Sequence, residues 1–451
     1  MGGLSTAKAL VMGAVLLGSA APVVARAEPV LLISIDGLRP GDVLEADKRG
    51  LKIPNLRRFL EQGAFATGVV GNLPTVTYPS HTTLITGVAP ARHGIVSNTT
   101  FDPRQVNYGG WYWYAQDITA PTLWDAARQG GLTAGNVHWP VSVGVKTLNW
   151  NMPQIWRSGH ADDRKLIRAL ATDGLYDALE HDCGSYADGI DEGVDADETR
   201  AKFAIRLIEM HKPDFLTVYL AALDHEEHLH GPGSAEANSV LERLDAAVGK
   251  LVAAELEQRP DATIALVSDH GFAATDTEIS LFRPFIDAGL IKLGADGKVA
   301  SWEAMPWPSG GSIAVVVARP DDPALKGMVG ALLEKLSADP QARIARVADQ
   351  AAIGTMGGNP QASYYVDLKP GALAGNFSAD APLAKPSRYK GMHGYFPALP
   401  EMRSTFMIMG KGVTRARNLG EIDMRAIAPT LARQMGVQLP RAEVATLKLG
   451  D

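Results

Sequence analysis

Three aspartates in this sequence each come at or just after the end of an apolar run. They are Asp36, Asp224 and Asp269. Apolar runs of this kind predict strands that are buried on both faces of a parallel sheet, and the carboxyl ends of parallel strands meet at one edge. One such acid is commonly a helix cap or turn residue. Three gathered carboxylates repel one another unless cations lie between them, so the pattern predicts a metal site.

Histidines near these acids supply the remaining ligands. Asp224 and His228 are four residues apart, so one turn of a helix would point them the same way. His393, from a distant loop, completes a three-ligand set that has one open position, as catalytic zinc sites do. The second set is Asp36, Asp269 and His270, with the Thr77 oxygen able to fill its fourth position. Two ions about 4 Å apart would clamp the attacking and leaving oxygens of a displacement at phosphorus.

The stretch 73–98 places a hydroxyl where an anion could bind. Thr77 stands just ahead of Tyr78 and Pro79, and the run that follows can start a helix because proline suits a first turn. A hydroxyl at a helix N-terminus faces free N–H groups and the positive end of the dipole, where an anion binds well. The alternative is an ordinary turn rich in proline and threonine.

The other polar residues near these motifs have simpler interpretations. His225, Glu226, Glu227 and His230 are expected to be solvated or to support the ligands, because the three-ligand set is already complete. His81 and His93 are expected to make structural hydrogen bonds.

Length and composition fit an ordinary globular protein. The chain has 451 residues, of which 46% are hydrophobic and 21% charged, enough for one large α/β domain with insertions or for two domains. The net charge of −7 and the lack of a Lys/Arg cluster argue against a surface that coats nucleic acid. Because Cys183 is the only cysteine, no intramolecular disulfide can form, and any metal must be held by histidines and carboxylates.

Residues 1–27 have the pattern of a signal peptide. Lys8 is followed by an almost wholly apolar stretch, and small residues precede a cleavage point after Ala27. A membrane anchor is the alternative, but this run is shorter than the roughly 20 apolar residues that a span needs. The expectation is therefore an exported protein, periplasmic or secreted, whose mature part is one catalytic domain over 28–451 with no integral membrane segment.

The rest of the pattern predicts an α/β fold with a mostly parallel central sheet flanked by helices and a small α+β insertion over about 280–388. Helices are expected over 53–63, 122–129, 197–211, 235–257, 323–337 and 423–435, and further strands over 132–139, 311–317, 344–347, 363–368 and 405–409. Residues 99–120 and 141–195 are expected to be irregular. The aromatic cluster of residues 108–114 packs a core edge or lines a substrate groove.

Six ordered motifs resemble those of the nucleotide pyrophosphatase/phosphodiesterase family, within the alkaline phosphatase superfamily, over about residues 30–439. The motifs are Ile35-Asp36-Gly37, Thr77-Tyr78-Pro79-Ser80-His81, Arg92-His93-Gly94 through Asn98, Asp224-x3-His228-x2-Gly231-Pro232, Ser268-Asp269-His270-Gly271 and Gly391-Met392-His393-Gly394-Tyr395.

The resemblance implies an alkaline-phosphatase-like fold, two Zn²⁺ per chain and a small-molecule phosphodiester substrate. It implies that Thr77 becomes phosphorylated and that Asn98 donates to a phosphoryl oxygen. It assigns Asp36, Thr77, Asp269 and His270 to one zinc and Asp224, His228 and His393 to the other. The family often has Phe-Pro-Asn after the nucleophile where this chain has Tyr78-Pro79-Ser80. Tyr78 still offers a flat face for a nucleobase.

Two other functions share these motifs. A phosphomonoesterase of the same superfamily would use the same metal core, but it tends to add Arg or Lys at the phosphoryl oxygens, and only Lys146 and Arg157 are available as candidates. A non-catalytic, metal-dependent binding protein would have no use for the hydroxyl of Thr77. A sulfatase is disfavoured because its Cys/Ser-x-Pro-x-Arg segment is absent. The sequence leaves the identity of the diester and the oligomeric state open.

Overall fold

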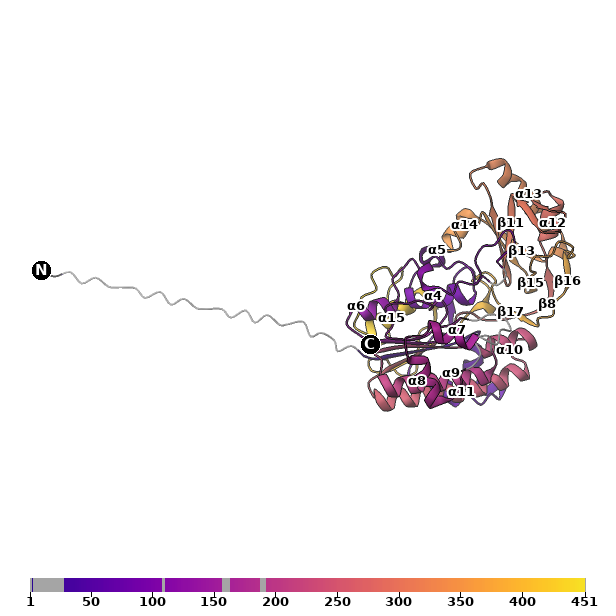
Figure 1. Cartoon of the computed structure of the whole chain (residues 1–451). Helices are drawn as coiled ribbons and strands as arrows, with labels where there is room; N and C mark the ends of the chain where they lie inside the picture. Colours follow the sequence, from indigo (N-terminus) through magenta and orange to yellow (C-terminus); the bar gives the residue numbers. More distant parts are fainter. Residues whose placement is uncertain (1, 3–27, 108–109, 156–162, 187–191, 451) are drawn as a thin grey trace.

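The computed structural model describes residues 2, 28–107, 110–155, 163–186 and 192–450. Residues 1 and 3–27 of the predicted signal peptide, together with Tyr108 and Arg157, lie outside the described residues. Within them, the central element is an eight-stranded sheet with helices on both faces (Figure 1). Its strands, in spatial order, are β19 (Arg417–Asn418), β2 (Ala64–Phe65), β18 (Phe406–Met409), β7 (Thr263–Val267), β1 (Val30–Ile35), β6 (Phe215–Leu220), β4 (Ala134–Val137) and β5 (Trp150–Met152).

The strands from β7 to β5 run parallel, as the continuous apolar runs predict. Strand β1 lies between β6 and β7 with Ile35 opposite Leu220 and Ser34 opposite Val267, so the three strands end at the same edge. Strand β18 is antiparallel to β7, which makes the sheet mixed at that side.

Side chains of β1 alternate between two hydrophobic cores. Leu31, Ile33 and Ile35 pack on one face, whereas Val30 and Leu32 pack on the other. The first face is covered by α3 (Pro54–Gln62), α7 (Asp163–Leu170), α8 (Leu175–Cys183), α9 (Val194–His211) and α11 (Ala235–Gln258). The second is covered by α4 (Thr77–Thr86), α6 (Leu123–Gln129) and α15 (Ile427–Gln434), as Figure 1 shows.

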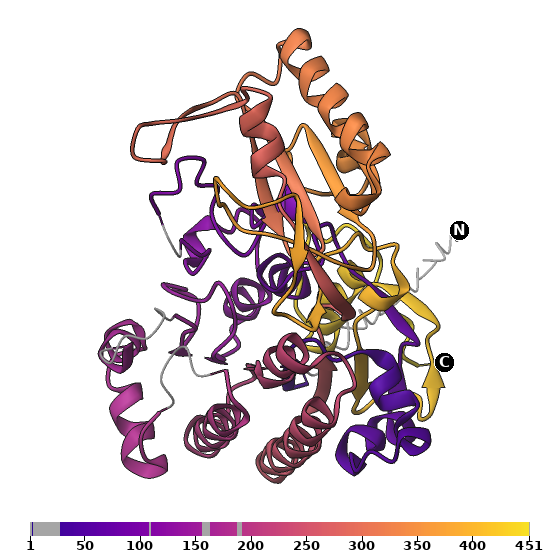
Figure 2. The same ribbon diagram turned by 90° about the vertical axis from the view of Figure 1, so that its right-hand side faces the viewer.

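The predicted insertion forms a separate α+β unit, orange in Figure 2, with its own hydrophobic core. It contains a four-stranded antiparallel sheet in the order β11 (Ala304–Ser309), β12 (Ser312–Val317), β14 (Tyr364–Leu368) and β13 (Ile344–Asp349). Helices α12 (Phe282–Asp287), α13 (Pro323–Ala338) and α14 (Gln350–Thr355) and the pair β9 (Ile291–Leu293) and β10 (Val299–Trp302) complete it.

A second small sheet connects the insertion to the edge where the main strands end. Strand β8 (Ala273–Ile279) pairs with β15 (Gly371–Ala374), β16 (Ala384–Pro386) and β17 (Gly391–Met392). Since β8 follows His270 and β17 precedes His393, this sheet brings two histidines from distant parts of the chain to one place.

Two local predictions were wrong. Asp224 does not end a strand, because β6 stops at Leu220 and Asp224 lies in the first turn of α10 (Ala222–His230). The segment 141–195 is not irregular: it contains β5, α7 and α8, whose short apolar stripes are separated by glycine and polar residues. The predicted helix start is confirmed: α4 begins at Thr77, and Pro79 falls in its first turn, where no backbone N–H is required.

A fully buried ion pair within α9 lies at the start of α10. Nη1 of Arg200 lies 2.6 Å from Oδ1 of Asp197, and both side chains are 0% exposed. The other oxygen of Asp197 accepts the N–H of Ala222 at 2.8 Å, which anchors the start of α10.

We expect Arg200→Met to lower the free energy of unfolding by about 3 to 5 kcal/mol, because the Asp197 carboxylate would stay buried without its partner. Urea unfolding measures the change. As a control, Arg243→Met removes a side chain that is 42% exposed and pairs with Asp195 and Glu198, and should change it by about 1 kcal/mol or less. Equal losses in both variants would contradict this account of the buried pair.

Candidate metal centre

The carboxyl ends of β1 and β7 place two aspartates side by side. Asp36 directly follows β1, and its N–H donates to the carbonyl of Leu220 at 2.9 Å. Asp269 follows β7 by two residues, and its Oδ1 accepts the N–H of Gly37 at 3.2 Å. Both side chains are buried, with exposed fractions of 1% and 0%.

His270 and Thr77 join these two carboxylates. Nε2 of His270 lies 3.0 Å from Oδ2 of Asp269 and 3.3 Å from Oδ1 of Asp36. The Thr77 hydroxyl lies 3.4 Å from the same nitrogen. All four side chains predicted as the first ligand set therefore converge.

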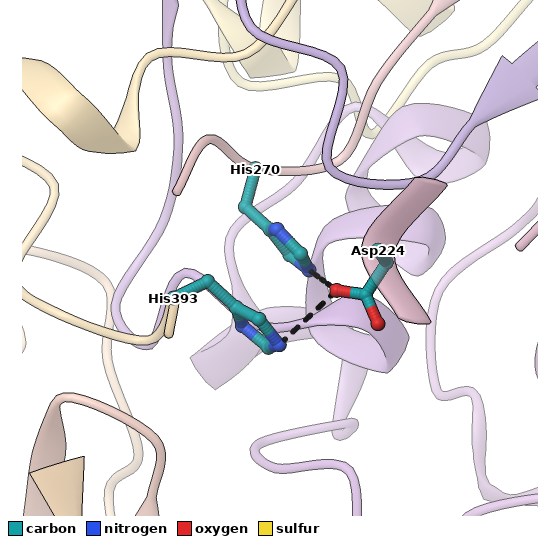
Figure 3. A group of neighbouring side chains, drawn as sticks. All are labelled: Asp224, His270 and His393. Atoms are coloured by element: carbon teal, nitrogen blue, oxygen red, sulfur yellow. Dashed lines mark ion pairs between the residues drawn. The ribbon is translucent and has the colours of Figure 1, made fainter. Parts of the chain in front are cut away.

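The second predicted set also converges, on the carboxylate of Asp224. Nε2 of His228 is 3.4 Å from Oδ2 of Asp224, and Nε2 of His393 is 3.5 Å from Oδ1. Figure 3 shows His393 and His270 approaching the same oxygen of Asp224. His270 lies farther away, at 4.0 Å, so the shorter contacts group it with Asp36 and Asp269.

The two ligand sets are in direct contact. The rings of His270 and His393 are stacked, with centroids 3.6 Å apart and planes 9° from parallel. Two ligand groups of three, Asp36–Asp269–His270 and Asp224–His270–His393, each have their ligand atoms within 4.8 Å of one another. This proximity suits a pair of neighbouring ions.

Backbone carbonyls orient each histidine. Nδ1 of His228 lies 3.0 Å from the carbonyl of Gly391, Nδ1 of His393 lies 3.1 Å from that of Thr75, and Nδ1 of His270 lies 3.3 Å from that of Gly271. When Nδ1–H donates to a carbonyl, the Nε2 lone pair is directed at the site, as a metal ligand requires. Gly391 is needed for the first contact, since a Cβ there would lie 2.4 Å from the carbonyl of Glu227.

Burial without counter-charge shifts the pKa of every ligand toward its neutral form. Burial, followed by repulsion from the neighbouring carboxylates, raises the pKa of Asp36 and of Asp224 well above the usual value. Burial raises the pKa of Asp269 to about 7 and lowers that of His228 to about 4. The imidazoles are thus neutral ligands, and the carboxylates require positive charge to remain ionised.

Unpaired oxygens show that the residues fit metal ions. Oδ1 of Asp36, Oδ1 of Asp224 and Oδ2 of Asp269 are buried and make no hydrogen bond. Buried polar atoms of this kind are rare in folded proteins unless an ion or water completes them. Imidazole nitrogens and carboxylate oxygens are the donors that zinc accepts in proteins.

Asn98 lies beside the start of α4. Its Oδ1 accepts the N–H of Tyr78 at 2.9 Å, which leaves its NH₂ group able to donate to a ligand next to Thr77. Tyr78 is only 1% exposed, and its ring centroid lies 5.3 Å from that of the Trp111 ring, with the two planes tilted by 55°. The stacking role of Tyr78 stays a prediction.

Sequence patterns did not identify Tyr219 as part of the site. Its hydroxyl donates to Oδ2 of Asp36 from the neighbouring strand β6, so it fixes the orientation of that carboxylate. A tyrosine inside an otherwise apolar buried strand needs a hydrogen-bond partner, and this was the one available signal.

The structure confirms the hydrogen-bonding roles predicted for two histidines. Nε2 of His81 lies 2.8 Å from Oγ of Ser34, and its Nδ1 lies 2.9 Å from the carbonyl of Thr77, so His81 helps to fix the backbone of the candidate nucleophile. His93 lies 3.0 Å from Oγ1 of Thr83. Burial lowers the pKa of each histidine to about 3.

The polar neighbours on α10 do not enter the cluster. His225 faces Glu192 and His230 faces Glu226, and these side chains are partly exposed. Glu227 is not solvated: it is 1% exposed and lies 3.4 Å from Nη2 of Arg39.

The fold is therefore a mostly parallel α/β sheet that gathers two Asp/His groups, with side chains of the kinds that bind metal ions, near the ends of its central strands. Residues 30–379 match the family described as type I phosphodiesterase / nucleotide pyrophosphatase. The chain therefore belongs to this family, which confirms the resemblance seen in the motifs.

Curated relatives agree over about half of the chain. Human ectonucleotide pyrophosphatase/phosphodiesterase family member 1 is 26% identical over 253 residues, which are 54% of this chain and 23% of the human protein. Venom phosphodiesterase 2 of Crotalus adamanteus is 28% identical over 256 residues, 54% of this chain and 26% of that protein. The aligned region spans well under half of each relative.

Solved structures agree over nearly the whole fold. Human ectonucleotide pyrophosphatase / phosphodiesterase 5 superposes with a TM-score of 0.64 at 18% identity and covers 94% of this chain and 97% of its own. The murine protein of the same name, described as an inactive threonine-to-alanine variant in complex with AMP, has a TM-score of 0.65 at 18% identity and covers 93% and 97%. This likeness establishes the fold, an alkaline-phosphatase-like sheet with added antiparallel sheets.

We expect His228→Ala to lower the molar ratio of bound metal to protein, because the site beside Asp224 would lose one of its nitrogen ligands. Metal analysis of the purified protein measures the ratio. His225→Ala, on the same helix but facing Glu192, is the matched control and should retain the metal of the parent. Metal loss in both variants, or in neither, would contradict the assignment of His228.

Proposed function

We propose that this protein is an exported two-zinc hydrolase that cleaves phosphodiester or pyrophosphate bonds through a phosphorylated Thr77. The observation that carries the proposal is the convergence of Thr77 with six Asp and His side chains, in which each aspartate has one buried oxygen without a hydrogen-bond partner. Family membership and the names of the relatives support the reaction class. The pattern of residues 1–27 supports export, periplasmic or secreted. No described helix is both long and apolar enough for a membrane span.

Asp36, Thr77, Asp269 and His270 would hold one zinc, and Asp224, His228 and His393 the other. When bound, two zinc ions would favour the alkoxide of Thr77 and offset the charge on the attacking and leaving oxygens, much as zinc lowers the pKa of bound water from about 16 to about 7. The first turn of α4 adds the positive end of its dipole at Thr77.

In the reaction, Oγ1 of Thr77 forms a bond to phosphorus while the bond from phosphorus to the leaving oxygen breaks on the opposite side. The NH₂ group of Asn98 donates to a non-bridging phosphoryl oxygen, and its Oδ1 bond to the Tyr78 N–H fixes its position. Water then hydrolyses the phosphothreonine and restores the hydroxyl. The AMP complex described for the murine relative is compatible with a nucleotide as the retained group.

The charges around the nucleophile favour a diester over a monoester. A monoester carries an extra negative charge that needs an added cation beside the phosphoryl oxygens. Among the described residues, no Lys or Arg forms a hydrogen bond or ion pair with Thr77 or Asn98, and Lys146 is exposed. The other candidate, Arg157, lies outside the described residues.

Thr77→Ala should lower kcat for bis-p-nitrophenyl phosphate by about 10³-fold or more while the bound metal is retained, because the variant lacks the attacking oxygen. Thr86→Ala, a buried threonine at the other end of α4, is the matched control and should keep kcat within about twofold of the parent. A Thr77→Ala enzyme with parental turnover would contradict the covalent mechanism.

The purified enzyme should prefer bis-p-nitrophenyl phosphate to p-nitrophenyl phosphate in kcat/KM by about tenfold or more, since among the described residues no Lys or Arg forms a hydrogen bond or ion pair with Thr77 or Asn98. Release of p-nitrophenol measures both rates. A preference for the monoester would support a phosphomonoesterase, and no turnover of either ester by the zinc-loaded protein would support a binding protein.

A further inference from the structure

The turn between β11 and β12 of the insertion lies directly against the loop that carries His393. The N–H of Gly311 in this turn donates to the carbonyl of His393 at 2.7 Å. The hydroxyl of Ser312, at the start of β12, donates to the carbonyl of Gly394. The two backbones approach so closely that a Cβ at Gly394, where φ is +87°, would lie 2.1 Å from the carbonyl oxygen of Ser309. The insertion is therefore bonded to the ligand residue itself and to the residue after it.

Asp367 extends this contact from the neighbouring strand. It lies on β14 directly opposite Ser312 of β12, and its Oδ1 accepts the N–H of Phe396 at 3.0 Å. The side chain of Asp367 is only 13% exposed, and its Oδ2 lies 3.2 Å from Nε of Arg346. Phe396 is 0% exposed, so loss of this acceptor would leave a backbone N–H buried without a partner. The end of the loop is thus fixed to the insertion as firmly as its start.

The main domain contacts the same loop through Thr75. Nδ1 of His393 lies 3.1 Å from the carbonyl of Thr75, and the Thr75 hydroxyl donates to the carbonyl of Tyr395 at 2.7 Å. Thr75 is 0% exposed and stands two residues before Thr77. The loop is therefore held between the insertion and the segment that precedes the candidate nucleophile. A shift of the loop would move Nε2 of His393 relative to Asp224.

The other ligands are mounted on different elements. The first ligand set follows β1 and β7 of the main sheet, and Asp224 and His228 lie on α10. His393 instead follows β17, in the segment that returns from the insertion. A ligand on a separate element can be displaced while the rest stay in place. A change in the insertion at its contact with the loop should therefore weaken one metal site and leave the other intact.

We propose that Asp367 and Ser312 are positioning residues for His393, through which the insertion sets the metal affinity of the site formed by Asp224, His228 and His393. The inference rests on the proposed two-zinc function and adds to it a role for the insertion. Hydrogen-bonding groups that orient a metal ligand from outside the site account for about 10- to 100-fold in metal affinity. Here the groups act on the backbone of the ligand residue and its neighbours.

The test measures zinc affinity directly, by competition between the purified protein and a chromophoric chelator. Asp367→Ala removes the acceptor of the Phe396 N–H, and we expect it to weaken the binding of one zinc ion by about tenfold and to leave the other within about twofold. At limiting zinc, anomalous diffraction should show the loss at the peak bounded by Asp224, His228 and His393. The kcat lost at limiting zinc should return in excess zinc, which a general folding defect would not allow.

Three further variants separate positioning from general stability. Ser312→Ala should weaken the same zinc ion, because it removes a hydroxyl that bonds to the loop. Asp367→Asn keeps an acceptor oxygen on the side chain and should restore the affinity for both ions. Tyr364→Phe is the matched control: on the same strand β14 it removes a hydrogen bond to the carbonyl of Lys326 on α13, away from the loop, so neither ion should respond.

Unchanged affinity for both ions in Asp367→Ala and Ser312→Ala, or equal weakening of both ions, would overturn the positioning role, while two zinc ions bound to the parent would keep the proposed function intact. A parent that binds no zinc would contradict both. If circular dichroism shows that Asp367→Ala does not fold, the result with Ser312→Ala decides. Selective weakening of one ion, restored by Asp367→Asn and absent from Tyr364→Phe, supports the proposal.

Discussion

Repulsion between three neighbouring carboxylates, two buried and one partly buried, is the constraint around which this protein is built. Asp36, Asp224 and Asp269 each have one buried carboxylate oxygen without a hydrogen-bond partner, and burial raises the pKa of all three. A protein interior keeps such a group ionised only when cations offset both the repulsion and the loss of hydration. The fold supplies the rest of what two cations need: neutral imidazoles, oriented by backbone carbonyls, and a hydroxyl at the start of a helix.

The way these residues are brought together explains how much could be predicted from the sequence. Asp36 and Asp269 follow apolar runs that are buried on both faces, so a parallel sheet with converging ends was readable from local pattern alone. The spacing of Asp224 and His228 indicated a shared helix face even though the strand was expected to extend to the acid. Periodicity therefore located the ligands, while the boundary between strand and helix, which depends on backbone hydrogen bonding, was misplaced.

Features that depend on packing between distant segments were not predictable. Tyr219 sits in a run that reads as apolar, and its bond to Asp36 exists only because β6 lies beside β1. The helices α7 and α8 were missed because each is short and lies between glycine and polar residues that resemble loop sequence. A cavity of about 530 Å³ beside the metal cluster joins Asn98 to residues nearly three hundred positions later, and no local signal records that juxtaposition.

The main sheet and the small sheet around β8 contribute different residues to the site. The main sheet and α4 hold the reacting groups, and the small sheet around β8 brings His393 to them.

The central claim is that two ions lie within the Asp/His cluster. Anomalous diffraction at the zinc edge from zinc-loaded crystals tests it most directly. The account predicts two peaks about 4 Å apart, one bounded by Asp36, Asp269 and His270 and the other by Asp224, His228 and His393. A cluster without peaks, in crystals whose protein retains activity, would contradict it.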